Sequence, residues 1–301
     1  MTVDTRAPAR TSPDGVVREN PTPGLPGGRR PRRDGWRVAA GCVAVAAALA
    51  AVWELVKLVA GLDDSRLPHT WEVLAYFFAR TSKGDIEIVF LLGNLWVTVQ
   101  AAVVGIGCAL LVGIGLGLLT AKRPVFGPSL MPILVLSRAL PLVALAPPLV
   151  ILLGPGWEAA TIMATLAGFF PAVIAVARGI REVPVAQREL LDSFGAPRRR
   201  QFTVLELPAA LTQTSAAIRT VAAWAFLGAV LAELPSGTQD GIAAVVLAAT
   251  QYYTYQPEPM WCAAAVVAAG GVALVYLISA LVRWAARLAL RTTHLPAGAE
   301  S

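Results

Sequence analysis

Six long apolar runs constrain this chain more than any other feature of its sequence. They cover residues 38–60, 88–119, 128–153, 157–177, 209–232 and 261–290. A helix of about 20 mostly apolar residues crosses the roughly 30 Å of hydrocarbon in a bilayer. A mean hydropathy of +0.63 and a charged fraction of 15% fit such a chain better than an ordinary water-soluble domain. We therefore predict an all-α membrane protein with about six transmembrane helices over residues 38–290.

The two ends of the chain lie outside these runs. Residues 1–37 are rich in Pro, Gly and Arg, and close on the run Arg29, Arg30, Pro31, Arg32, Arg33. Such a segment buries too little apolar area to fold, which predicts a disordered basic tail. A secretory signal is the alternative, but the following apolar run is longer than a signal core and predicts a retained helix. Residues 291–301 are the C-terminal tail.

The basic residues are unevenly distributed between the two sides of the predicted membrane. Twenty of the 25 fall in the N-terminal tail, residues 122–123, residues 178–219 and the C-terminal end, whereas Arg66, Arg80 and Lys83 fall on the other side. The positive-inside rule then places both termini in the cytoplasm of a multi-pass cell-membrane protein. The net charge of +6 is read as a topology signal, and we expect membrane lipid, not nucleic acid, around this chain.

Two apolar runs carry residues that shape helix packing. Glycines crowd the second run, and they include one Gly-x-x-x-Gly pair: Gly105, Gly107, Gly113, Gly115 and Gly117. Glycine lets helices approach closely in lipid, so this run is expected to pack tightly. The third run is broken by Pro132, Pro141, Pro147 and Pro148. Broken helices need neighbouring helices or a water-filled cavity to satisfy the freed carbonyls, which makes Pro141 a candidate for the translocation path.

The soluble segment 178–208 is the most informative part of the chain. Residues 186–194 have the pattern of a short amphipathic helix, with Leu190, Leu191 and Phe194 on one side. Gly195 suits the left-handed residue just past a helix end, and Pro197 prevents continuation. This helix could lie on the membrane or dock into another protein.

The segment resembles the cytoplasmic signature of binding-protein-dependent ABC importer permeases. That signature is Glu-Ala-Ala, three residues, Gly, nine residues, Ile, one residue and Leu-Pro. Here the matching positions keep the register with leucines in place of the alanines and of the isoleucine: Glu189, Leu190, Leu191, Gly195, Leu205, Leu207 and Pro208. The resemblance implies a cytoplasmic coupling helix, with Asp192 and Phe194 also at the surface that contacts the ATPase.

Softer matches suggest the nitrate, sulfonate and taurine branch of that family. They include Gly93-Asn94-Leu95, Arg138-Ala139-Leu140-Pro141 and Ala232-Glu233. The resemblance implies a type I ABC importer permease that dimerises with a second copy or a paralogue. It also implies a dimer of ABC ATPase subunits, an extracytoplasmic substrate-binding protein and a small solute, with nitrate, sulfonates and taurine as anionic examples.

Chemistry on this chain itself is not expected. It has no Gly-x-x-x-x-Gly-Lys-Ser/Thr loop, so ATP is expected on a partner subunit and no cofactor on this chain. His69 and His294 are far apart, no nucleophile-base pair stands out, and the three cysteines have no metal-ligand spacing, so neither catalytic nor metal residues are predicted. A secondary active transporter is the main alternative, although only one run is heavily broken by proline.

Three ionisable groups near or inside the predicted spans need an explanation. Arg138 lies within the third run, either paired structurally with Glu233 or freed carbonyls, or drawing an anion along the path. Glu233 closes the fifth run, either solvated or locally paired, or positioning an outer gate or the docked binding protein. Glu54 and Lys57, three residues apart, are expected to pair with each other on one helix face.

Overall fold

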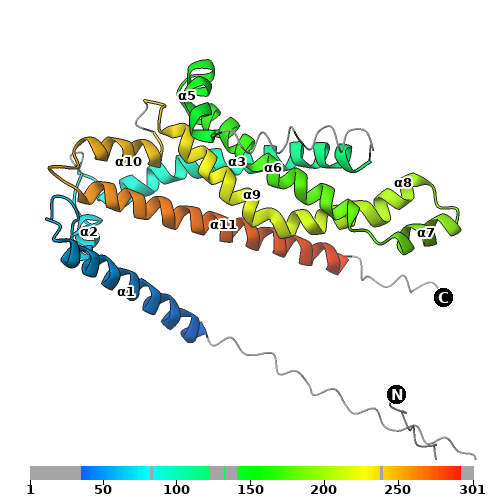
Figure 1. Cartoon of the computed structure of the whole chain (residues 1–301), viewed down its shortest axis with the longest axis horizontal. Coiled ribbons are helices and arrows are strands. Elements are labelled where there is room, and N and C mark those ends of the chain that lie inside the picture. The colour runs from blue at the N-terminus through cyan, green and yellow to red at the C-terminus, as the bar shows by residue number, and fades with distance from the viewer. Residues whose placement is uncertain (1–34, 82–83, 123–131, 133–140, 238–239, 293–301) are drawn as a thin grey trace, which may run out of the picture. The chain divides into compact units, whose positions relative to one another are not determined.

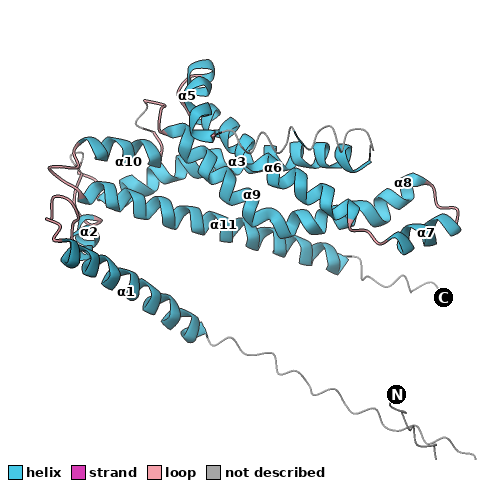
Figure 2. Ribbon diagram, in the orientation of Figure 1, coloured by secondary structure: helices cyan, strands magenta, loops and turns pink. Residues whose placement is uncertain are grey.

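The structure is a computed structural model that describes residues 35–81, 84–122, 132, 141–237 and 240–292. Within these residues the named elements are all helices (Figures 1 and 2): α1 (Gly35–Ala60), α2 (Thr70–Tyr76), α3 (Glu87–Lys122), α5 (Leu142–Leu153), α6 (Trp157–Arg181), α7 (Val185–Ser193), α8 (Arg198–Gln201), the π-helix η1 (Phe202–Glu206), α9 (Leu207–Glu233), α10 (Ile242–Gln251) and α11 (Glu258–Thr292). The prediction of an all-α chain is confirmed for this part.

Five helices in the described part are long and apolar enough to cross a membrane. They are Val43–Ala60, Glu87–Ala121, Trp157–Arg181, Arg198–Glu233 and Glu258–Ala285. These overlap five of the six predicted spans, with ends that differ by several residues. Of the third span, 128–153, the structure describes Pro132, Pro141 and the 12-residue α5, and Arg138 lies outside the described residues.

The chain divides into two units, Met1–Val52 and Trp53–Ser301. The described part of the first unit is the beginning of α1, in which every side chain from Val43 to Leu49 is exposed. An apolar helix with apolar side chains exposed all around suits surrounding lipid. The second unit holds the end of α1 and all the other helices.

Small residues let three helices of the second unit approach closely. Gly105, Gly113 and Gly117 of α3 face Ala164, Ala172 and Val176 of α6, at a constant offset of 59 residues, so the two helices run parallel. A Cβ at Gly113 would lie 2.4 Å from the Cβ of Ala172. Gly107 and Gly115 have nothing within 4 Å, so the expected close packing is confirmed for three of the five glycines.

The helix α9 completes this core by packing against both α6 and α3. A Cβ at Gly228 would lie 2.6 Å from the Met163 carbonyl oxygen, and one at Gly179 would lie 2.7 Å from the Ala209 carbonyl oxygen. The buried side chains around these crossings are mostly alanine, with Ile106, Met163, Val221 and Phe226 filling the larger spaces. Backbone-to-backbone contact therefore fixes α3, α6 and α9 as one block.

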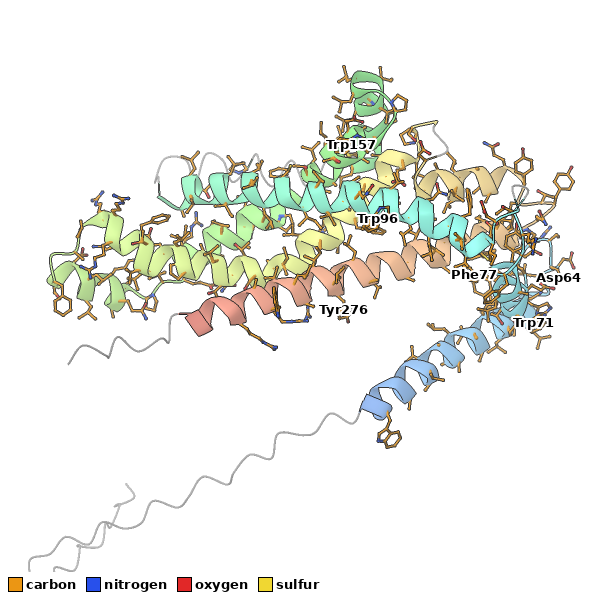
Figure 3. All side chains as sticks on the ribbon, turned by 180° about the vertical axis from the view of Figure 1, so that it is seen from behind. Asp64, Trp71, Phe77, Trp96, Trp157 and Tyr276 are labelled. Carbon is orange, nitrogen blue, oxygen red and sulfur yellow. The ribbon has the colours of Figure 1, made fainter. Side chains whose placement is uncertain are left out.

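The two ends of the second unit differ in what they carry. The short helices α2 and α10 lie at one end, and α7 and α8 lie at the other (Figure 1). Asp64, Trp71 and Phe77 gather at the first end, beside the start of α3 (Figure 3). The α7–α8 end carries the arginines Arg188, Arg198, Arg199 and Arg200.

The expected pairing of Glu54 with Lys57 is wrong. The Glu54 carboxylate accepts hydrogen bonds from the backbone N–H and the hydroxyl of Thr70, both at 2.9 Å, and lies 2.7 Å from Nδ1 of His69. Lys57 instead bonds to Asp64. Residues beyond the helix end supply better-placed partners than the neighbouring turn does, and they tie the end of α1 to the start of α2.

Candidate functional site

The predicted short helix is α7, and its end has the expected geometry. Gly195 has a φ of +65°, which an L side chain rarely adopts. Its N–H donates to the Asp192 carbonyl at 2.9 Å, and the Ala196 N–H donates to the Leu191 carbonyl at 3.0 Å. This pair of bonds is a Schellman motif, which closes a helix with a left-handed glycine. The prediction that Gly195 is the left-handed residue just past the helix end is confirmed.

The exposed surface of α7 and its C-cap carries large apolar side chains. Leu190 is 57% exposed and Phe194 is 77% exposed, while Glu189 is exposed beside them. Leu191 is half-buried, so it faces the rest of this chain more than the other two do. Large exposed apolar side chains are typical of a surface that another protein or a membrane covers.

Side-chain hydrogen bonds hold α7 against its neighbours. Nη2 of Arg188 donates to the Ile180 carbonyl near the end of α6, at 2.6 Å. The Gln201 amide of α8 donates to the Asp192 carboxylate and to the Ala196 carbonyl. Asp192, which was predicted to contact the ATPase, here accepts the hydrogen bond that joins α7 to α8. Leu207 and Pro208, the other predicted residues of the signature, begin α9.

A groove of about 620 Å³ runs between α5, α6 and α9, on the face away from α3. Pro141, one of the predicted path residues, is the N-cap of α5, and the next two residues line the groove. The lining from α6 and α9 includes Phe170, Arg178, Gln213, Thr220 and Trp224. A groove of this size can hold a small organic solute.

Sequence reasoning missed the groove residues. Gln213, Thr220 and Trp224 lie seven and four residues apart, which places them on one face of α9. Polar and aromatic residues at that spacing in an otherwise apolar span face a protein interior or a cavity more often than lipid. That periodic pattern in the fifth span was the available signal.

Glu233 is buried, so the expectation that solvent surrounds it is wrong, whereas local pairing is confirmed. Its Oε2 accepts the N–H of Ala243 at 3.0 Å, and its carboxylate is hydrogen-bonded to the Thr98 hydroxyl. Oγ1 of Thr98 in turn accepts the Ile242 N–H at 3.1 Å. Glu233 and Thr98 thus satisfy the first N–H groups of α10 and join it to α9 and α3. A cavity of about 220 Å³ lies beside Glu233, lined also by Trp157 and Asp240.

Within the described residues, no three His, Cys, Asp or Glu side chains come together as a metal ion would require. The described residues assemble an exposed apolar surface on α7, a groove between α5, α6 and α9, and a buried polar junction at Glu233. Together with five helices long and apolar enough to cross a membrane, these features fit the class of membrane permeases.

Comparison with known proteins agrees with that class. Residues 113–292 match the family described as "Binding-protein-dependent transport system inner membrane component". The match covers more than half of the chain, and the chain belongs to this family. It is therefore a transport permease component of the ABC importer family, with the type I fold, and not an enzyme.

Individual relatives extend the similarity. A protein of Haemophilus influenzae named "Probable ABC transporter permease protein" is 29% identical over 64% of this chain and 75% of its own length. SsuC of Bacillus subtilis, whose name assigns it to aliphatic sulfonates transport, is 27% identical over 68% and 72%. The riboflavin transport system permease protein RibX of Chloroflexus aurantiacus is 33% identical over 39% of this chain and 44% of its own.

Proposed function

We propose that this chain is the permease subunit of an ATP-driven importer in the cell membrane, with both termini in the cytoplasm. In this proposal two permease subunits, identical or paralogous, form the translocation path. ATP is bound and hydrolysed by a dimer of separate ATPase subunits, and an extracytoplasmic binding protein delivers the solute. The permease contributes a path and a mechanical linkage and makes or breaks no bond.

The observation that carries the proposal is the exposed apolar surface of α7. Leu190 and Phe194 project from a helix whose end is fixed by the Gly195 motif and whose sides are tied to α6 and α8. A flexible loop would lose conformational entropy on docking, whereas this helix is already ordered. A preformed apolar surface of this kind supports a role as the coupling helix.

The length of the adjoining helix supports the same role. The segment Arg198–Glu233 is 36 residues of continuous helix and therefore about 54 Å long. A bilayer with its headgroups is about 40–45 Å thick. With Glu233 at the outer boundary, Arg198, Arg199 and Arg200 reach beyond the headgroups into water. The α7 helix, joined to α8, then lies where a soluble ATPase can reach it.

The groove between α5, α6 and α9 is the proposed path of this subunit. Gln213, Thr220 and Arg178 line it, and polar side chains of this kind in membrane helices usually face a protein interior or an aqueous cavity. The opposite faces of α6 and α9 are occupied by the core. The groove is thus the face on which a second subunit and the solute are expected.

The proposed class of solute follows from the nitrate, sulfonate and taurine branch that the sequence resembles and from the names of the relatives. SsuC is named for aliphatic sulfonates, whereas RibX is named for riboflavin and a relative in Halalkalibacterium halodurans, ThiX, for formylaminopyrimidine. The proposal therefore covers small anions such as nitrate, sulfonates and taurine, and small planar heterocycles. Arg138, a proposed path residue, and Arg178 of the groove are the cations that would favour an anion.

The proposed mechanism is alternating access. Closure of the ATPase dimer on ATP moves the two α7 helices, these move the helix bundle, and the path opens to the outside to accept solute. Hydrolysis and product release reset the bundle. Glu233 joins α9 to α10 at the outer end, so we assign the α10 junction to the outer gate.

The test is ATP-dependent uptake by proteoliposomes that contain this chain with its ATPase and binding protein. Glu189→Lys reverses a charge on the proposed docking surface, where a misplaced charge costs several kcal/mol. We expect it to abolish co-purification of the ATPase and uptake together. Asp85→Lys makes the same charge change at the opposite end and is expected to leave co-purification intact. Uptake driven by an ion gradient without the ATPase would instead support a secondary active transporter.

A further inference from the structure

The two walls of the groove differ in chemistry. The α6 wall is apolar through Leu166, Phe170 and Ile174, and its one polar lining residue is Arg178 at the end near α7. The α9 wall alternates apolar residues with hydrogen-bonding ones, Gln213, Thr220 and Trp224. A solute in this groove therefore meets hydrocarbon on one side and donors on the other.

The positions along the helices place these groups at different depths. Trp224 lies nine residues before Glu233, about 14 Å along α9, and Phe170 lies 13 residues after Trp157, about 20 Å along α6. Both are near the middle of a 30 Å hydrocarbon layer. Arg178 and Gln213 lie at the inner boundary. The Gln213 side-chain amide donates a hydrogen bond of 2.5 Å to the Glu182 carboxylate. Phe170, Thr220 and Trp224 thus line the groove at mid-depth.

This arrangement discriminates between the solute classes left open above. A small anion loses its hydration at mid-depth, and the α6 and α9 walls carry no cation there to replace it, which makes its passage along these two walls costly. A cation finds no carboxylate among the lining residues. A flat ring, in contrast, can lie against Phe170 and Trp224 and accept hydrogen bonds at its edge from Thr220.

We propose, resting on the function proposed above, that the transported solute carries a planar heteroaromatic ring and that Phe170, Thr220 and Trp224 bind that ring at mid-membrane. Trp224 supplies the stacking surface, and the Thr220 hydroxyl donates a hydrogen bond to a nitrogen or carbonyl oxygen at the edge of the ring. Small aliphatic sulfonates and inorganic anions are then poor solutes for this permease.

The test uses the assembled permease–ATPase complex in nanodiscs without the binding protein, so that binding reports on the permease. Riboflavin is the probe, since stacking on tryptophan quenches flavin fluorescence. We expect saturable quenching that formylaminopyrimidine reverses and methanesulfonate does not. Trp224→Ala should weaken the apparent affinity on the order of tenfold, as expected for loss of one ring-stacking partner, and Trp224→Phe should restore most of it.

The matched control is Trp284→Ala, which removes an exposed tryptophan of α11 outside the groove and should change nothing. Equal effects of Trp224→Ala and Trp284→Ala would overturn the assignment, because quenching would then be nonspecific. Saturable competition by methanesulfonate with no response to either ring compound would overturn it too. In parallel, ATP-dependent uptake of methanesulfonate by the same complex would leave the importer function standing while this inference fails.

Discussion

The α3–α6–α9 core and the α7 helix place their apolar residues in opposite ways. In the core the contact residues are small and hidden, so backbones touch at Gly113 and Gly228. In α7 they are large and exposed, with Leu190 and Phe194 uncovered by this chain. The first pattern stabilises a helix bundle in lipid, where small residues let dispersion contacts form. The second is favourable when another protein or a lipid interface covers it.

The largest effect is expected when a large residue replaces a glycine of the core. Gly113→Val places side-chain atoms against Ala172 and the Val173 backbone, which cannot yield without moving α6. We expect a loss of at least about 2 kcal/mol of stability and poor recovery of folded protein. Thermal unfolding followed by size-exclusion chromatography measures it. Gly115→Val, two residues along the same helix and facing open space, is the control and should leave the protein stable.

The second prediction sharpens the comparison at α7. Gly195→Val forces a β-branched side chain into a left-handed conformation, at a local cost of roughly 1 kcal/mol or more. We expect normal insertion and dimerisation but a sharp fall in ATPase association and in solute-stimulated hydrolysis. Gly61→Val is the matched control, because Gly61 has a φ of +61° and nothing within 4 Å of a Cβ placed there, in the loop after α1. A similar fall in both variants would show that general strain, and not docking, is responsible.

The buried polar junction at α10 tests whether hydrogen bonds stabilise contacts between helices there, as close packing at glycines does in the core. Thr98→Val keeps the side-chain shape but leaves the Ile242 N–H without its acceptor, and Thr98 is fully buried. An unsatisfied buried group costs about 1–3 kcal/mol. Thermal unfolding should show a loss in that range, against almost none for Thr212→Val on the exposed side of α9. No loss in Thr98→Val would mean that water or another group satisfies α10.

The smallest effect is expected at the loop that follows α1. The hydrogen bond from the Lys57 ammonium holds the pKa of Asp64 below its ordinary value of 3.8. A lowered pKa means that the pair stabilises the folded state above pH 3.8, and that this contribution is lost as the pH falls through the folded pKa. The acid-unfolding curve of Asp64→Asn should therefore be slightly flatter below pH 4 than that of the wild type. Identical curves would show that the pair of Lys57 and Asp64 contributes nothing to stability in this pH range.

The sequence predicted those features whose cause is local. Gly195 followed by Pro197 indicated the end of α7 because the left-handed cap involves only adjacent residues. Five of the six glycines of α3 predicted close packing, but Gly107 and Gly115 were indistinguishable from the three contact positions, since only the orientation of α6 separates them. Long-range partners were missed in the same way. Glu54 bonds to residues 69 and 70, and Glu233 bonds to residue 243 and to Thr98, 135 positions earlier.

The close crossing at Gly179 has a mechanical consequence for the long helix formed by α8, η1 and α9. That helix is continuous, and it touches α6 backbone-to-backbone at Ala209, between α8 and the groove residue Trp224. It touches α6 again at Gly228, where a Cβ would lie 2.6 Å from the Met163 carbonyl oxygen. Two backbone crossings on one helix hold it like a strut fixed at both ends, and Trp224 lies between them. A displacement of α8 is therefore transmitted to α6 and α9 together, and the groove wall moves as part of a rigid block.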